Sequence, residues 1–195
     1  MRDKPSLPAD YFENMFQGTD DPWDLATSPY EQAKYADTIK ALAGRSYRHG
    51  FEIGCAKGVL TLQLSQHCSR LLAIDVSETA LAAARERCAE FPSVSFSRMV
   101  FPREAPSQTQ FDLVVLSEVA YYWNDADLTR AALWLTDHVS TGGDVLLVHW
   151  IGETDYPQSG DDAIEKLGDA IQLPMDVLCA ERREKYRLDL WRRRP

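Results

Sequence analysis

The sequence has few cysteines and no long apolar run, and each shortage excludes a class of protein. The four cysteines, Cys55, Cys68, Cys88 and Cys179, form no C-x-x-C pair, so we expect reduced thiols and neither a zinc site nor a disulfide framework. No stretch approaches the ~20 apolar residues that span a bilayer. The first five residues carry no apolar run of a secretory signal. We therefore expect a cytoplasmic protein with no membrane partner.

Basic charge is also scarce. The chain has 21 Lys and Arg against 30 Asp and Glu, a formal net charge of −9, which argues against nucleic acid as a partner. We interpret the one dense basic run, Arg192-Arg193-Arg194, as a solvated tail. With 45% hydrophobic residues in a chain of 195, the sequence predicts one well-buried domain over residues 1–195.

The N-terminal part differs in composition from the rest. Proline, aspartate and aromatic residues alternate over about the first 25 positions. A helix is then predicted from Pro29 to about Leu42, because Ser28 can cap it and proline suits its first position. We expect residues 1–44 to form an N-terminal lid or helical segment, and residues 45–195 to form a Rossmann-like core.

Buried strands and helices alternate through the core. The expected strands read almost uniformly Val, Leu and Ile, which is typical of a parallel sheet covered by helices on both faces. They are 51–54, 71–75, 94–97, 111–116 and 144–149. Two last runs, 177–182 and 186–191, follow a helix at 161–171 and are too close for a crossover, so they must be antiparallel. This is typical of the seven-stranded class I methyltransferase fold, with sheet order 3-2-1-4-5-7-6 and an antiparallel strand 7.

One loop carries the strongest chemical signal. Glu52-Ile53-Gly54-Cys55-Ala56-Lys57-Gly58 lies between the first strand and its helix, and it resembles motif I of class I methyltransferases with Ala56 in the middle glycine position. Glycines there let the backbone approach a ligand closely, although a tight strand–helix turn is the alternative. Asp75 ends the second strand, where a carboxylate accepts hydrogen bonds from ribose hydroxyls or caps a helix.

The glycine-containing loop and Asp75 together could bind either NAD or S-adenosylmethionine (SAM). The acid Glu52, the missing second catalytic domain and the terminal hairpin favour SAM, and Glu52 could hold its amine. At the third strand's end, Arg98 and Met99 are expected to frame the adenine, with core packing as the alternative for Met99.

Further candidates follow the fourth and fifth strands, whose carboxyl ends form the ligand-binding edge of such sheets. The Ser117 backbone is expected to line the methionine part of SAM, and Glu118 to point towards the methyl donor or acceptor. His149 is expected to act as the general base, with a core histidine as the alternative. The run Tyr121-Tyr122-Trp123 would floor the acceptor pocket or pack in the core.

Several of these segments form a set with the N-terminal one. They are Asp21-Pro22-Trp23, Ser28-x-Tyr30-Glu31, Lys34-Tyr35, the Glu52–Gly58 loop and Ser117-Glu118-Val119. The set resembles the NodS-like methyltransferases, the nodulation protein S family. The resemblance implies N-methylation of the amine of a deacetylated N-acetylglucosamine residue in a chitooligosaccharide. It also implies a lid in which Trp23, Tyr30 and Lys34 neighbour the cofactor.

The combined expectation is a SAM-dependent methyltransferase that acts on a small-molecule or saccharide acceptor, first of all the amine of an amino sugar, and releases S-adenosylhomocysteine. An O-methyltransferase of a sugar or small acid, and a SAM-binding protein without turnover, are the alternatives. The oligomeric state stays open. The expected catalytic residues are His149 and Glu118; the expected cofactor-binding residues are Trp23, Tyr30, Lys34, Glu52, Gly54, Cys55, Ala56, Gly58, Asp75, Val76, Arg98, Met99, Ser117 and Glu118.

Overall fold

The computed structural model describes residues 4–195, which divide into two compact units. One unit is Pro8–Met99, and the other is Val100–Pro195 together with residues 4–7. The sheet has seven strands in the order β3-β2-β1-β4-β5-β7-β6, so the expected class I methyltransferase fold is confirmed. No helix within residues 4–195 is long and apolar enough to cross a membrane.

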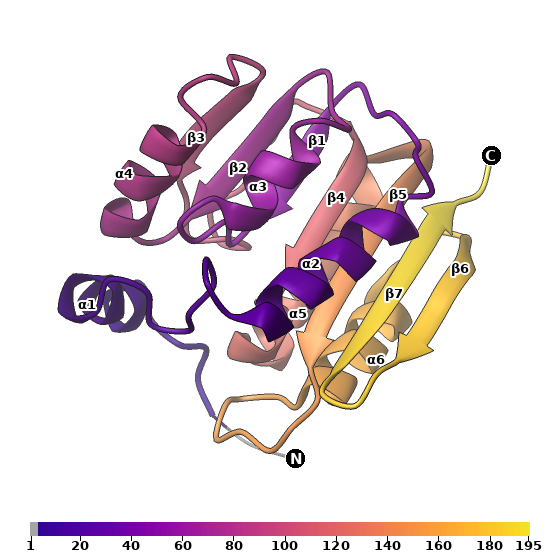
Figure 1. The fold of residues 1–195 in the computed structure, drawn as a ribbon. Coiled ribbons are helices and arrows are strands. Elements are labelled where there is room, and N and C mark those ends of the chain that lie inside the picture. The colour runs from indigo at the N-terminus through magenta and orange to yellow at the C-terminus, as the bar shows by residue number, and fades with distance from the viewer. Residues whose placement is uncertain (1–3) are drawn as a thin grey trace. The chain divides into compact units, whose positions relative to one another are not determined.

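The unit Pro8–Met99 contains three parallel strands and four helices (Figure 1). Helix α4 packs against β2 and β3, α3 against α4, and α2 against α3, while α1 lies against α4. Phe51, Leu71 and Leu81 are wholly or almost wholly buried among these elements. The bounds are α1 Ala9–Gly18, α2 Pro29–Ala41, β1 Gly50–Ile53, α3 Val59–Leu64, β2 Leu71–Asp75, α4 Glu78–Arg87 and β3 Val94–Arg98.

Local signals explain where two of these helices begin. The Ser77 hydroxyl accepts the N–H of Ala80 at 3.0 Å and caps α4. The Ser28 hydroxyl accepts the N–H of Glu31 at 3.5 Å and caps α2, as the sequence predicted. Helix α1 was not predicted, and Pro8 at its N-cap forms no side-chain capping bond.

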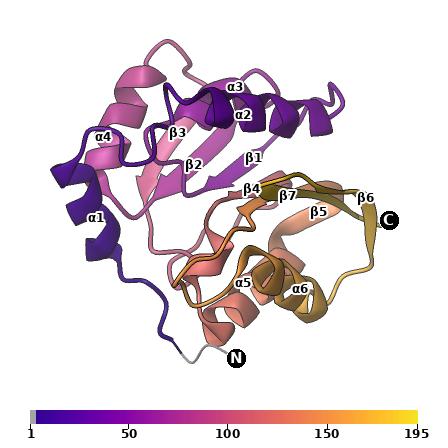
Figure 2. The same ribbon diagram turned by 60° about the horizontal axis from the view of Figure 1, so that its bottom comes forward.

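The second unit holds the other four strands. β4 and β5 run parallel, and β7 pairs antiparallel with both β5 and β6, as expected. Helices α5 and α6 lie side by side, and α6 packs against β5 and β7 (Figure 2). The bounds are β4 Phe111–Ser117, η1 Ala120–Tyr122, α5 Asp125–His138, β5 Val139–Trp150, α6 Gly160–Ala170, β6 Met175–Arg182 and β7 Tyr186–Arg193.

Strand β5 begins earlier than the sequence indicated. We expected this strand over residues 144–149, but β5 starts at Val139. Val139 pairs with Phe111, and Asp144 pairs with Leu113, so the intervening residues form an irregularity in the ladder. Gly142 takes a φ of +71° there, which suits glycine.

The basic run at the end of the chain is not a solvated tail, so that interpretation was wrong. The Arg192 guanidinium donates to both carboxylate oxygens of Asp144, at 2.7 and 2.9 Å, and Asp144 is wholly buried. Arg193 donates to the carbonyl oxygen of Val139, and Arg194 pairs with Asp176. A buried carboxylate requires such a partner, and Arg192 provides it from within β7, which ends at Arg193.

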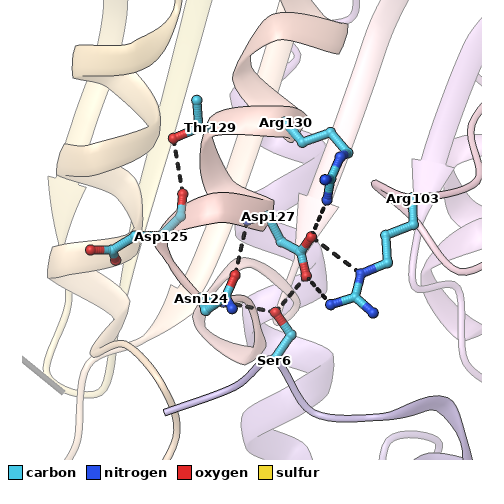
Figure 3. A network of polar contacts seen from close by, with 7 residues as sticks. All are labelled: Ser6, Arg103, Asn124, Asp125, Asp127, Thr129 and Arg130. Carbon is cyan, nitrogen blue, oxygen red and sulfur yellow. Dashed lines mark hydrogen bonds and ion pairs between the residues drawn. The ribbon is translucent and has the colours of Figure 1, made fainter. Parts of the chain in front are cut away.

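A cluster around Asp127 ties residues 4–7 to the start of α5 (Figure 3). The buried Asp127 carboxylate accepts bonds from Ser6 Oγ at 2.6 Å, Arg103 Nη2 at 2.9 Å and Arg130 Nη1 at 2.5 Å. Ser6 Oγ also accepts the N–H of Asn124. Burial would raise the pKa of Asp127, but the bonds from Arg103 and Ser6 and both guanidinium charges hold it below its ordinary value.

Replacing Asp127 with alanine should therefore lower the free energy of unfolding by about 2–3 kcal/mol at neutral pH. Because the folded-state pKa is depressed, this contribution is present above the unfolded-state pKa and is lost as the pH falls through the folded value. Urea unfolding of both proteins from pH 7 downwards measures the difference. A gap between them that stays constant into strong acid would contradict this account.

Two glycines of α6 provide a matched test of packing at the end of β5. A Cβ at Gly160 would lie 2.1 Å from the carbonyl oxygen of Trp150, a backbone atom, whereas one at Gly168 would meet only the Trp191 ring at 3.4 Å. Gly160→Ala should thus destabilise the fold by about 2 kcal/mol or more. Gly168→Ala should leave stability unchanged or raise it by up to about 1 kcal/mol. Thermal unfolding checks both, and equal effects would refute the argument.

Candidate functional site

The loop between β1 and α3 keeps the backbone shape of a glycine-rich motif. Gly54, Ala56 and Gly58 all have positive φ angles, +77°, +45° and +78°. A Cβ at Gly58 would lie 3.1 Å from the Cα and Cβ of Ala84, so a side chain there would require α4 to shift, and the positive φ also favours glycine. Ala56 adopts the same left-handed region despite its side chain, at a cost of about 1 kcal/mol. The middle glycine is therefore replaced in sequence but not in conformation.

Asp75 holds this loop in place. One of its carboxylate oxygens accepts the N–H of Ala56 at 2.9 Å, and the other accepts the N–H of Ser77 at 2.9 Å. Burial raises the pKa of Asp75, and these backbone donors oppose the increase. A carboxylate oxygen can accept more than one bond, so Asp75 can join the loop to the start of α4 and still receive a ligand hydroxyl. The sequence had left both roles open, a ribose contact and a helix cap, and the bond from Ser77 at the start of α4 corresponds to the second.

Glu52 presents a buried carboxyl with unused capacity. Among the described residues its Oε2 has no hydrogen-bond partner, and neither has the Oγ1 of the buried Thr61. Burial raises the pKa of Glu52 to about 7, and the charge of Asp75 adds to the increase. A buried unsatisfied carboxyl oxygen is costly, so this position suits a ligand that brings a donor or a positive charge.

The ends of β2 and β3 gather three more expected residues. Arg98 Nε donates to the carbonyl oxygen of Val76 at 3.1 Å, and the N–H of Met99 donates to the carbonyl oxygen of Asp75 at 3.1 Å. Cys55 packs instead in a buried cluster with Ala73 and Leu81, and burial raises the pKa of its thiol well above the ordinary value. Its side chain therefore belongs to the core.

The N-terminal segment is fastened to the same region of its unit. Glu13 of α1 accepts a bond from the Thr79 hydroxyl of α4 at 2.6 Å. Bonds from Thr79 and Ser77 lower the pKa of Glu13 to about 2. Lys57 of the glycine-rich loop donates to the carbonyl oxygen of Asp20. One residue within α1 and one just after it thus contact α4 and the glycine-rich loop, the two elements that Asp75 joins.

The three aromatic and basic residues expected near the cofactor fall in two groups. Trp23 packs edge-on against Phe16, with ring centroids 5.6 Å apart. Lys34, only 3% exposed, pairs with Glu31 at 2.9 Å, and its ammonium lies over the Tyr30 ring, 5.3 Å from the centroid. Their contact with a cofactor stays a prediction.

In the other unit, Glu118 follows Ser117, the last residue of β4, in a strained conformation. Its φ is +57°, which is uncommon for a residue with a side chain. Its Oε2 accepts two bonds, from the Tyr121 hydroxyl at 2.7 Å and from the N–H of Trp150 at 2.8 Å. Such strain persists where surrounding contacts over-determine it, typically at functional sites.

His149 lies at the end of β5 but is wholly buried. Its Nε2 accepts the N–H of Ala120 at 3.1 Å, so the neutral ring carries its proton on Nδ1 and the Nε2 lone pair is occupied. Taking up a proton at Nε2 would break that bond. The geometry therefore favours the alternative left open above, a core histidine, over a general base.

Three tyrosines pack on one another, and one of them, Tyr121, contacts both Glu118 and His149. The ring of Tyr121 stacks on that of Tyr156, with centroids 5.4 Å apart and an interplanar angle of 11°. Tyr122 meets both rings edge-on. Burial is the main cause that raises the pKa of Tyr121 and of Tyr122 well above the ordinary value, and the charge of Glu118 adds to it. Both hydroxyls therefore stay protonated. Within residues 4–195 no cluster of His, Cys, Asp or Glu could hold a metal ion.

Comparison with known proteins assigns the chain to a family. The family model of nodulation protein S (NodS) matches residues 11–144. The chain belongs to the nodulation protein S family. A curated NodS of Bradyrhizobium diazoefficiens is 36% identical over 119 residues, which cover 58% of this chain and 54% of that protein. This chain spans about half the length of the curated NodS relatives that it matches.

Solved structures agree with the assignment to the NodS family. The N-methyltransferase NodS from Bradyrhizobium japonicum WM9, crystallised with S-adenosyl-L-homocysteine, has a TM-score of 0.80 and 25% identity. The match covers 95% of this chain and 97% of that NodS. A methyltransferase of Pseudomonas syringae, titled putative, has a TM-score of 0.73 and 34% identity, with 84% and 99% of the two chains covered.

Proposed function

We propose that this chain is a SAM-dependent methyltransferase. The observation that carries the proposal is the Asp75-fastened loop beside Glu52, a buried carboxyl with an open oxygen. A donor-rich nucleoside ligand satisfies both groups at once. The resemblance in fold to a NodS crystallised with S-adenosylhomocysteine supports the same cofactor.

Six of the expected cofactor residues then have definite tasks. Glu52 accepts from the amine of the ligand's amino-acid part, and Asp75 accepts from the ribose hydroxyls while it holds the loop. Val76, Arg98 and Met99 frame the adenine by packing and backbone contacts. The backbone of Ser117 lines the methionine part. Bound SAM supplies a methyl group on a positively charged sulfur, and the protein's task is to align the acceptor with it.

Glu118 is the first candidate for the group that accepts the acceptor's proton. It is partly exposed, and its carboxylate is held by the Tyr121 hydroxyl and the Trp150 N–H. His149 becomes the second candidate, because it is wholly buried and its Nε2 is engaged. A proton acceptor is needed because an amine attacks only when it is unprotonated.

We propose an amine acceptor, first of all the free amine of an amino sugar. Support comes from membership of the family and from a related NodS that is titled an N-methyltransferase. Incubation with tritiated SAM and a chitooligosaccharide bearing one deacetylated residue should label the amine. Transfer only to hydroxyl acceptors would instead identify an O-methyltransferase, and SAM binding without any transfer would identify a binding protein.

The N-terminal segment is expected to act as a lid that orders when the cofactor binds. Hydrogen exchange over residues 11–36 should slow when S-adenosylhomocysteine is added, because Trp23, Tyr30 and Lys34 would then pack on it. Helix α5, to which no cofactor contact is assigned, provides the region for comparison. Equal exchange of residues 11–36 with and without the ligand would exclude a lid.

A further inference from the structure

The loop of residues 151–158 is held at both ends, although it contains no regular structure. The N–H of Ile151 donates to the carbonyl oxygen of Lys185, and the N–H of Gln158 donates to the carbonyl oxygen of Tyr121. The Gln158 side chain, 3% exposed, bonds to Asp125 at 2.8 Å and accepts from Lys166 at 2.9 Å. This loop therefore has a defined shape, and Tyr156 lies within it.

The position of Tyr156 connects the loop to Glu118 through one further side chain. The ring of Tyr156 stacks on the ring of Tyr121 in a nearly parallel arrangement, 5.4 Å between centroids. The hydroxyl of Tyr121 donates to Glu118 Oε2 at 2.7 Å. Because the stack fixes the plane of the Tyr121 ring, it also fixes the direction in which the hydroxyl donates.

The two donors on Glu118 come from different places in the chain. One is the side chain of Tyr121 in η1, and the other is the backbone N–H of Trp150 at the end of β5. The Trp150 bond depends on the sheet, whereas the Tyr121 bond depends on ring packing by Tyr156, Tyr122 and His149. A change in the loop of residues 151–158 therefore reaches Glu118 through Tyr121.

We propose that Tyr156 is a positioning residue: it holds Tyr121 so that the Tyr121 hydroxyl fixes the Glu118 carboxylate, and residues 151–158 thereby determine the geometry of the proton-accepting group. The proposal rests on the proposed function for its role in turnover. The link between Tyr156 and Glu118 can be tested without cofactor or acceptor.

The Trp150 amide provides the readout, because it donates to the same Glu118 oxygen. Its ¹⁵N–¹H resonance should shift with pH as that carboxylate titrates. The variant Tyr121→Phe removes a donor that stabilises the charged Glu118 carboxylate. The midpoint should therefore move upward by about one pH unit. Tyr156→Ala should move it in the same direction by a smaller amount. Tyr156→Phe keeps the stack and should restore the original midpoint.

Controls separate this link from general damage. His149 adjoins Trp150 and contacts Tyr121, so the series is repeated with His149→Gln, which removes the titration of that ring. Melting temperatures show whether each variant is folded, and Tyr156→Leu, which also removes the aromatic stack but keeps more side-chain volume, takes the place of Tyr156→Ala if the alanine variant is not. An unchanged midpoint in Tyr121→Phe would overturn the proposal. So would a Tyr156→Phe midpoint displaced as far as that of Tyr156→Ala. If the midpoints shift as predicted but the unchanged protein transfers no methyl group, the proposed function is contradicted and the link between Tyr156 and Glu118 stands.

Discussion

Replacing Asp75 with alanine is expected to weaken binding of S-adenosylhomocysteine by about tenfold or more. Two losses add up. The ribose hydroxyls lose their acceptor, and the N–H groups of Ala56 and Ser77 lose the carboxylate that joins the loop to α4. Each stranded buried donor costs about 1–3 kcal/mol, so the free energy of unfolding should fall as well. Calorimetric titration and urea unfolding measure the two effects.

A matched variant distinguishes ligand contact from general destabilisation. Leu81→Val removes one methylene from the wholly buried side of α4 and should cost about 1 kcal/mol of stability. It touches neither Asp75 oxygen, so affinity for S-adenosylhomocysteine should stay within about twofold of the original. Unchanged affinity in Asp75→Ala would remove Asp75 from the cofactor site. An equal loss in Leu81→Val would attribute the effect to stability.

Replacing Glu118 with glutamine is expected to lower kcat by about 10²–10³-fold, the range of a lost proton acceptor. The amide keeps the size of the side chain and an oxygen for the Trp150 N–H, so the affinity for S-adenosylhomocysteine should change little. Glu90→Gln, an exposed residue that follows α4, should leave kcat unchanged. Steady-state assays with tritiated SAM and the deacetylated chitooligosaccharide provide the comparison.

His149→Gln should have the opposite pattern. The wholly buried ring packs edge-on against Tyr121 and accepts the Ala120 N–H, so its loss should lower the melting temperature. The kcat of the folded fraction should stay near that of the unchanged protein. A folded His149→Gln protein with a large loss of kcat, beside an active Glu118→Gln protein, would return the role of base to His149.

Local signals in the sequence predicted much of the fold. Buried apolar runs and a serine cap placed β2 at its observed bounds and α2 at its observed start. Helix α1 escaped prediction because it buries only Phe16 and is held mainly by a distant contact, Glu13 with Thr79. The role of the C-terminal arginines also escaped prediction, because it depends on a distant contact. Arg192 pairs with Asp144, which lies 48 positions earlier, and no local pattern reveals such a partner.

The sequence predicted where the residues of the candidate site lie better than it predicted what their side chains do. The sequence placed Asp75 and His149 at the ends of strands, where ligands bind in such sheets. It could not show that Asp75 also accepts two backbone N–H groups, since this depends on the loop's conformation. Nor could it show that the Ala120 N–H engages His149, because the 3₁₀ turn η1 brings that group to β5.

The central claim is that this chain binds SAM and not another nucleoside cofactor. Isothermal titration of the full chain with S-adenosylhomocysteine, and separately with NADH, tests it most directly. The account predicts saturable binding of one equivalent of S-adenosylhomocysteine and no binding of NADH at the same concentrations. Heat from NADH alone, or a folded protein that binds neither ligand, would contradict it.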